Sequence, residues 1–266
     1  MIAIVTAGGE IQPDEPLYAV TQGGLKAMVD INGKPMVQWV LDALCASSDV
    51  DRVVVVGLPP ETSLDCACPL HLLPDQGDML SNIRMAVREC LRIDPTSAYA
   101  ILAAGDNPAL RSEIVDWLTC QAQDYDQDIY VTLLERTTLE VEFPESRRNY
   151  THLKNMQVCN GDLYCFRLEA AIQEKPLWES LVTSGKNPFR QASILGYDTL
   201  LFLTLRQLTL KDAEATINKR MGIKGRMILS PYAEIGMRID KPAHLEFMRE
   251  YLARRHARNT ADTPSN

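Results

Sequence analysis

A pair of glycines follows the first apolar run, which spans residues 2–6, and stands where it could bind a ligand. Gly8 and Gly9 stand where a strand of an open α/β sheet would end, and a lysine, Lys26, follows after a stretch with no other basic residue. Backbone N–H groups in such a turn can face a phosphate group. The pair therefore indicates a phosphate-binding turn, although a tight turn without a ligand would use the same residues.

The residues after the glycine pair disfavour two common nucleotide-binding patterns. The dinucleotide-binding pattern G-x-G-x-x-G leads directly into a helix, whereas here Glu10, two prolines and further acidic residues follow. The P-loop pattern G-x-x-x-x-G-K-[ST] is absent from the sequence. Binding of NAD and binding of a P-loop nucleotide are both disfavoured.

Cysteine and histidine show no repeated metal-ligand spacing. Of the seven cysteines only Cys66 and Cys68 are close in sequence, whereas zinc sites typically contain two such pairs. We expect these thiols to be buried or unreactive in a reducing cytoplasm. The four histidines are expected to be surface or packing residues rather than catalysts.

Alternating strands and helices must position the glycine turn in the first half of the chain. Four consecutive valines in 52–57 indicate a strand that is buried on both faces, as in a parallel sheet. Further strands are expected at 2–6, 69–73, 99–103 and 129–134, and helices at 35–45, 78–92 and 110–121. Strands that alternate with helices in this way predict right-handed βαβ units and a mostly parallel sheet.

The second half of the chain has weaker patterns but clear signals for helix ends. Thr209 and Asp212 have the spacing of a capping box, and Gly222 stands where a glycine commonly ends a helix. The expected elements are one or two strands in 149–166 around a turn at Asn160-Gly161, helices in 168–220, a strand at 225–229, a closing helix at 242–255 and a flexible polar tail at 256–266.

Composition and charge exclude several classes of protein. With 266 residues, of which 46% are hydrophobic and 23% charged, the chain has an ordinary globular composition. No apolar run approaches the ~20 residues that span a bilayer, and the first run is interrupted too early to form a signal peptide. A formal net charge of -8 argues against general nucleic-acid binding, which relies on lysine and arginine. We expect a cytoplasmic protein that binds neither nucleic acid nor membranes.

Several short motifs, in the expected order, resemble those of the MobA-like nucleotidyltransferases. They are T-A-G-G at 6–9, K-A-M-V at 26–29, G-K-P-M at 33–36, G-D-N-P at 105–108 and I-D-K-P-A-H-L-E at 239–246. The resemblance implies a GT-A-like fold (the nucleotide-diphospho-sugar transferase fold), an α/β three-layer sandwich with a mostly parallel central sheet and helices on both faces. It further implies one domain over 1–255, with a nucleotide-binding half at 1–135 and an acceptor-side half at 136–255.

Enzymes of this family join a nucleoside triphosphate (NTP) to a phosphorylated acceptor, and this chemistry requires no general base. A phosphate monoester has a second pKa near ~6 and is a dianionic nucleophile at neutral pH. Attack on the α-phosphorus releases pyrophosphate, so the enzyme mainly supplies positioning and neutralising charge. The resemblance implies Lys26 and Asp106 as catalytic residues, and Asp106 with Asp240 as ligands of Mg²⁺. We expect the Lys26 side chain to be exposed.

The resemblance also implies two sets of binding residues. The nucleotide set is Ala7, Gly8, Gly9, Lys26, Gly77 and Asn82, and the acceptor set is Asn160, Gly161 and Lys186. Several of these positions have a purely structural alternative. Asp106 could form a turn, Asp240 could cap the last helix, and Asn160-Gly161 could be a plain hairpin turn.

The sequence departs from the family pattern before Lys26. Family members carry S-x-R-[MF]-G between the glycines and the lysine, which places an arginine on the triphosphate, whereas 10–25 contains neither arginine nor lysine. Arg84, Lys186 or Arg190 could supply the missing charge. Two alternatives to a nucleotidyltransferase remain open: a GT-A glycosyltransferase, although its usual D-x-D is not found at 106–108, and a nucleotide-binding relative without turnover.

Overall fold

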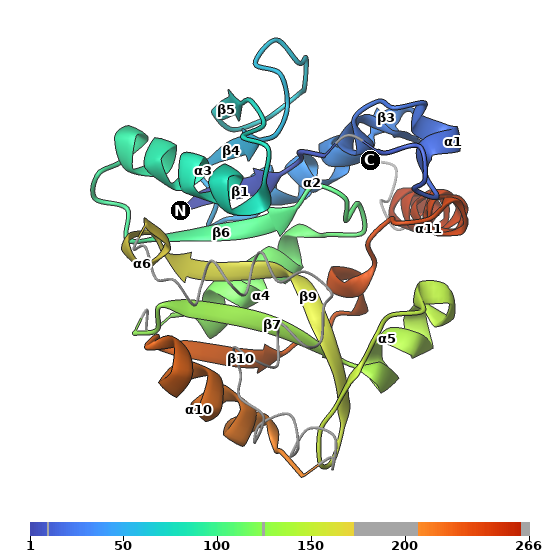
Figure 1. Ribbon diagram of the computed structural model, residues 1–266. Helices are drawn as coiled ribbons and strands as arrows, with labels where there is room; N and C mark the ends of the chain where they lie inside the picture. Colours follow the sequence, from blue (N-terminus) through green and yellow to red (C-terminus); the bar gives the residue numbers. More distant parts are fainter. Residues whose placement is uncertain (10, 124–125, 173–206, 262–266) are drawn as a thin grey trace.

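A mixed sheet of eight strands forms the centre of the computed structural model, which describes residues 1–9, 11–123, 126–172 and 207–261. Within these residues the strand order is β10-β7-β9-β6-β1-β4-β5, and β8 pairs with β9 (Figure 1). The bounds are β1 Ile2–Thr6, β4 Arg52–Val56, β5 Leu70–Leu73, β6 Tyr99–Ala104, β7 Ile129–Glu135, β8 Thr151–His152, β9 Gln157–Arg167 and β10 Gly225–Leu229.

Most neighbouring strands run parallel, as the alternating pattern predicts. β1 pairs in parallel with β4 and β6, β4 with β5, and β7 with β10. The exception is β9, which is antiparallel to both β6 and β7 and lies between them. A strand from the second half of the chain therefore lies between two strands, β6 and β7, that precede it in the sequence.

Helices cover both faces of this sheet. Alternate side chains of β1 face opposite ways: Ala3 and Val5 belong to a core shared with α2 and α4, and Ile2 and Ile4 to a core shared with α3. The bounds are α1 Tyr18–Thr21, α2 Met36–Cys45, α3 Met79–Ile93, α4 Ser112–Gln121, α5 Arg136–Glu142, α6 Leu168–Ile172, α10 Leu210–Met221 and α11 Pro242–Ala261. These layers confirm the predicted three-layer α/β fold.

The ends of the elements agree closely with the sequence signals. The capping box is present, since the Thr209 hydroxyl accepts from Asp212 N and the Asp212 carboxylate accepts from Thr209 N. Gly222 ends α10 in the left-handed region, with a φ of 60°. The last helix, α11, continues past Arg255 to Ala261, so the flexible tail expected at 256–266 is wrong for 256–261. The helices expected within 173–206 lie outside the described residues.

The turn expected at Asn160-Gly161 is wrong, because β9 continues through both residues, with a shift of its register against β7 between Asn160 and Tyr164. Gly161 is required here by packing instead of by a turn: a side chain would collide with the Thr132 hydroxyl on β7 and with the Ile235 side chain. A small hairpin of β2 (Asp30–Ile31) and β3 (Lys34–Pro35), the helix α5, and 3-10 turns at Lys26–Met28, Pro144–Ser146 and Ala233–Gly236 were not expected. Within the described ranges, every helix is too short or too polar to cross a membrane.

Candidate active site

The carboxyl ends of three parallel strands bring the predicted motifs to one edge of the sheet. Residues 7–9 follow β1, Gly57 follows β4 and Asp106 follows β6. Ala7 N donates to Val56 O at 2.8 Å, and Gly105 N donates to Thr6 O at 2.9 Å, so the chain remains hydrogen-bonded just beyond the strand ends. Ligands of open α/β sheets bind at this edge.

A cavity of about 290 Å³ opens at this edge. All six residues predicted to bind the nucleotide line it, namely Ala7, Gly8, Gly9, Lys26, Gly77 and Asn82. Other lining residues include Asp75, Asp106, Asp162, Tyr164 and Arg238. The cavity thus joins the glycine loop to the loop that precedes α3.

Two glycine loops pack directly on one another at the floor of this cavity. A methyl group on Gly57, which has a φ of 107°, would collide with the backbone of Gly8. Position 57 must therefore be glycine for the loops to approach this closely, and a side chain on Gly8 would crowd Asp75 and Asn82. The second glycine of the first loop, Gly9, has a φ of 112° and faces open space.

Buried Asn82 fixes the loop on the other wall of the cavity. Its Nδ2 donates to Asp75 Oδ1 at 2.6 Å, and its Oδ1 accepts from Gln76 N at 2.8 Å. Gly77 turns the chain with a φ of 89°. Asp78 is the N-cap of α3, since its carboxylate accepts from the backbone N–H of the first turn. Asn82 holds the loop in place, which leaves backbone groups of the loop at the cavity.

Lys26, Asp106 and Asp240, from three distant parts of the chain, meet in one ion-pair cluster. The Lys26 Nζ lies 2.6 Å from Asp106 Oδ2 and 2.9 Å from Asp240 Oδ1. The Lys26 side chain is only 16% exposed, so the prediction of an exposed lysine is wrong. Ile239 N also donates to Asp106 O at 3.1 Å, which ties the segment before α11 to the end of β6.

Arg238 completes this cluster and was missed by the sequence analysis. Its Nη2 and Nε donate to Asp106 Oδ2 at 2.9 and 3.2 Å, and its Nη1 lies 3.8 Å from Asp162 Oδ1 on β9. On the other side of Asp162, Arg148 Nη2 lies 3.9 Å from Oδ2. Among the described residues that line the first cavity, Arg238 is the one arginine. Arg84 is on α3, outside the residues that line the cavity, and Lys186 and Arg190 lie outside the described residues.

The three carboxyl groups of the site differ in protonation. Burial opposes ionisation of Asp106, but Lys26 and Arg238 hold its pKa below the usual range. Burial likewise opposes ionisation of Asp240, and Lys26 lowers its pKa. For Asp162 burial prevails over the attraction of Arg238 and Arg148 and raises the pKa to about 7. Asp162 can thus gain or lose a proton near neutral pH, whereas the other two carboxyls stay ionised.

The carboxylates that surround Lys26 also fit a divalent metal ion. Asp106 Oδ1 is buried and has no hydrogen-bond partner among the described residues, while Oδ2 accepts from both Lys26 and Arg238. Asp106 and Asp240 approach one shared cation, the Lys26 ammonium, closely enough for both to bind it. The Asp240 carboxylate contacts Lys26, and no described hydrogen bond links it to the N-terminus of α11.

A second cavity, of about 590 Å³, adjoins the first at Lys26 and Arg238, which line both. Its other polar lining residues include Arg147, Arg148, Asn149, Asn160, Asp240, Lys241 and His244. Of the predicted acceptor residues, Asn160 lines this cavity, Gly161 packs against β7 and Ile235 instead, and Lys186 lies outside the described residues. Burial lowers the pKa of His244, whose Nδ1 accepts from Asp240 N at 3.4 Å.

Replacing Asp162 with asparagine should make the protein relatively more stable as the pH rises. A folded-state pKa of about 7, above the unfolded value of ~3.9, means that Asp162 stabilises the fold fully below pH ~4 and loses this contribution as the pH rises through about 7. Urea unfolding of Asp162→Asn and wild type should therefore show a difference that shifts in favour of the variant by roughly 2–3 kcal/mol between pH 5 and pH 8. A constant difference, or a shift toward wild type, would mean that Asp162 is an ionised partner of the two arginines.

Comparison with known proteins assigns this fold to a class. A hypothetical transferase from Thermus thermophilus superposes with a TM-score of 0.78 and 30% sequence identity, covering 92% of this chain and 98% of that chain. CMP:2-keto-3-deoxy-manno-octonic acid synthetase complexed with CTP has a TM-score of 0.57 at 16% identity, covering 96% and 99% of the two chains. 4-Diphosphocytidyl-2C-methyl-D-erythritol synthase from Anaerococcus prevotii has a TM-score of 0.54 at 12% identity, covering 95% of this chain and 97% of that chain.

These structural similarities confirm a nucleotide-sugar transferase-like fold. A match to a family model identifies the family. The MobA-like NTP transferase domain matches residues 3–187. The chain therefore belongs to the MobA-like NTP transferase family of nucleotidyltransferases, as the motifs indicate. No curated protein matches it in sequence.

Proposed function

We propose that this protein transfers a nucleoside monophosphate from an NTP to a phosphorylated small-molecule acceptor, with release of pyrophosphate. The observation that carries this proposal is the junction of the two cavities. Lys26 and Arg238 line both, and the carboxylates of Asp106 and Asp240 converge on Lys26 there. Two substrates bound in the two cavities would meet beside two cations.

The first cavity suits the nucleotide. Open backbone of the glycine loop can face phosphate groups, and the loop held by Asn82 offers polar backbone atoms to a base. Lys26 and Arg238 would neutralise charge on the triphosphate as the α-phosphorus is attacked. A phosphate oxygen of the acceptor forms the new bond to the α-phosphorus while the bond to pyrophosphate breaks, so no side chain has to remove a proton.

The second cavity suits an anionic acceptor. Arg147, Arg148 and Lys241 line it together with the shared Arg238 and Lys26. Arginine in particular can bind a phosphate group through two parallel hydrogen bonds. A phosphorylated sugar or cofactor is therefore a better candidate than a neutral alcohol, and this separates the proposal from a glycosyltransferase, which would have a nucleotide sugar as donor.

Mg²⁺ is the proposed metal, and Asp106 and Asp240 are the residues that would hold it. Mg²⁺ is commonly bound by one or two carboxylates together with phosphate oxygens and water. When bound, it would neutralise charge on the phosphoryl oxygens of the NTP. The unpartnered Asp106 Oδ1 supports this assignment.

Pyrophosphate release from each of the four NTPs, with mixed sugar phosphates as acceptors, tests the proposal directly. We expect release that requires NTP, acceptor and Mg²⁺ together. CTP belongs in the panel because one solved structure of similar fold is a complex with CTP. We also expect Mg²⁺ and the active NTP together to raise the melting temperature more than either does alone, because phosphate oxygens complete the metal site.

The two readouts separate the alternatives. A thermal shift without pyrophosphate release would indicate a nucleotide-binding relative that lacks turnover. Release of a free nucleoside diphosphate from a nucleotide sugar would indicate a glycosyltransferase. If no NTP binds to the protein and none releases pyrophosphate, the proposal is wrong.

A further inference from the structure

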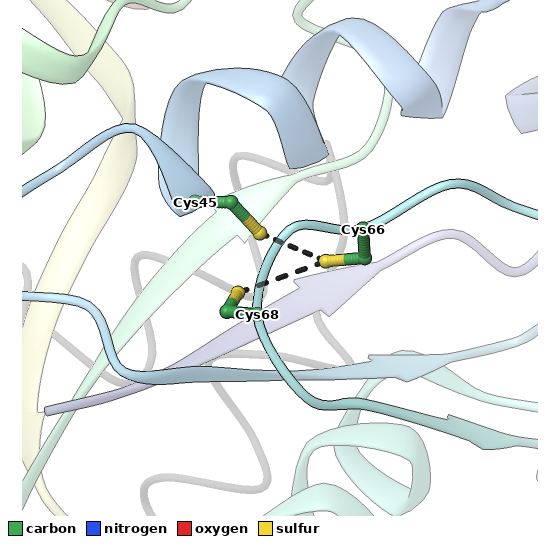
Figure 2. A group of neighbouring side chains, drawn as sticks. All are labelled: Cys45, Cys66 and Cys68. Atoms are coloured by element: carbon green, nitrogen blue, oxygen red, sulfur yellow. Dashed lines mark hydrogen bonds between the residues drawn. The ribbon is translucent and has the colours of Figure 1, made fainter.

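Three cysteines from two separate segments bring their sulfur atoms together outside the candidate active site. Cys45 is the last residue of α2, and Cys66 and Cys68 lie in the connection from β4 to β5 (Figure 2). The Sγ atoms of Cys45 and Cys66 are 2.8 Å apart, those of Cys66 and Cys68 are 3.7 Å apart, and the three atoms lie within 4.8 Å of one another. The sequence shows only the Cys66-Ala67-Cys68 spacing, because Cys45 is 21 residues before Cys66.

The surroundings of this thiol cluster disfavour free thiolates. All three residues are half-buried against the main core. Burial is the main cause that raises the pKa of Cys66, and burial together with the hydrogen bond to Cys45 raises the pKa of Cys68 to about 11. Without a ligand the thiols of Cys66 and Cys68 therefore stay protonated, and thiols are weak hydrogen-bond donors and acceptors. A cation among the three sulfurs would stabilise the thiolate form and release the thiol protons to water.

The sulfur positions fit one metal ion with small adjustments. A zinc–sulfur distance of ~2.3 Å places neighbouring sulfurs roughly 3.8–4.0 Å apart around a shared ion. Cys66 and Cys68 already have nearly this separation. The Cys45 sulfur would have to move away from that of Cys66 by about 1 Å, which a change of its χ1 angle at the end of the helix can supply.

We propose that Cys45, Cys66 and Cys68 form a binding site for a thiophilic d¹⁰ metal ion, Zn²⁺ or Cu⁺. Soft thiolate ligands select these ions over Mg²⁺ and other hard cations. Among the described residues no histidine, aspartate or glutamate joins the three sulfurs. The site therefore has three protein ligands, which suits three-coordinate Cu⁺, or Zn²⁺ with a water molecule in the fourth position.

The bound ion would fasten the connection between β4 and β5 to α2. This connection is already joined to α2 by Gln38. Its Nε2 donates to Asp65 O at 2.5 Å, and its Oε1 accepts from Asp65 N at 3.0 Å. It continues through β5 into the loop that Asn82 holds at the nucleotide cavity. The metal in this position is structural: it links two segments of the chain, and its binding stabilises the native state.

Metal content of the purified protein tests this inference. After loading with Zn²⁺, or with Cu⁺ under anaerobic conditions, and dialysis in the presence of a thiol-free reductant, we expect one thiolate-bound ion per chain. Cys45→Ser and Cys68→Ser should lose that ion, and Cys120→Ser, which removes an exposed cysteine outside the cluster, should retain it. Circular dichroism of each variant establishes that it is folded.

Alkylation of the wild-type protein gives a readout that needs no variant. Bound Zn²⁺ or Cu⁺ should slow modification of Cys45, Cys66 and Cys68 at least ~10-fold while Cys120 reacts as before, as peptide mass spectrometry would show. This pattern also excludes metal held at Asp106 and Asp240. The inference is overturned if no ion survives dialysis, if Cys120→Ser loses metal equally, or if the reduced cluster cannot be loaded and forms only a disulfide in air.

Discussion

Lys26→Ala is expected to reduce nucleotidyl transfer by at least ~10-fold and also to destabilise the fold. Loss of a charge-assisted contact to a phosphate costs about 1.5–3 kcal/mol, which gives the loss of rate. The Lys26 ammonium also lies between Asp106 and Asp240 and is largely buried, so its removal leaves two carboxylates with one cation fewer. We expect a loss of roughly 1–3 kcal/mol in the free energy of unfolding, less than for a fully buried pair because Arg238 still neutralises Asp106.

Lys34→Ala is the matched control for this experiment. Lys34 belongs to the neighbouring G-K-P-M motif and pairs with Asp42 at 2.7 Å, but both side chains are more than 40% exposed, at 47% and 43%. An exposed pair of this kind contributes about 0–1 kcal/mol. Lys26→Ala should therefore lose turnover and resistance to urea, whereas Lys34→Ala should resemble wild type in both measurements. If Lys26→Ala unfolds more easily yet keeps full activity, Lys26 is a structural residue and its proposed role is wrong.

Asp106→Asn is expected to have the largest effect on turnover, a loss of at least ~100-fold. The substitution keeps the shape of the side chain but removes the charge that Lys26 and Arg238 share, a change worth roughly 3 kcal/mol or more in the transition state. The Mg²⁺ concentration for half-maximal activity should also rise, because an amide oxygen is a poorer ligand for this ion than a carboxylate.

Asp240→Asn provides the second arm of this measurement. It should raise the Mg²⁺ requirement in the same direction, and the effects of the two substitutions should be less than additive because both carboxylates would share one ion. Asparagine caps a helix about as well as aspartate, so a capping role for Asp240 predicts no change in metal dependence. Unchanged Mg²⁺ dependence in Asp240→Asn, with Asp106→Asn impaired, would leave Asp106 as the sole carboxylate ligand.

The stability of Asp106→Asn should depend on pH in the opposite sense to that of Asp162→Asn. The lowered pKa of Asp106 means that its charge stabilises the fold above the unfolded value of ~3.9, and that this contribution disappears as the pH falls through the folded value. The deficit of the variant should therefore be largest near neutral pH and shrink in acid.

Local patterns in the sequence were sufficient to predict alternating strands and helices and a mostly parallel sheet, and the family resemblance supplied the particular fold. The valine run of β4, the capping box at Thr209 and the glycine at 222 each have one dominant physical cause, and the structure has all three features where they were expected. At Asn160-Gly161 a tertiary contact prevailed over the local signal, because only glycine fits against Thr132 and Ile235. The expected turn also left Asp162 outside the predicted site, because its buried position depends on β9 continuing past Asn160.

The rest of the candidate site depends on contacts between distant segments. Arg238 stands two residues before Asp240 in the sequence, which is a signal that could have been used, but its partner Asp106 is 132 residues away. Arg148 is brought to Asp162 only by the position of β9. The thiol cluster likewise requires α2 and a later connection to meet, and spacing along the chain contains no sign of Cys45 as a third member.

The position of β9 also determines the order in which the sheet can be assembled during synthesis. β6 and β7 are made before β9, yet they never pair with each other, because β9 lies between them. A nascent chain that ends before Gln157 therefore has an open edge on β6 and two open edges on β7, and unpaired strand edges are templates for association with other chains. Release of β9 from the ribosome closes two of these edges, and β10 closes the second edge of β7 later. Stalling or truncation between 136 and 156 should therefore direct this protein to aggregates instead of to a folded N-terminal half.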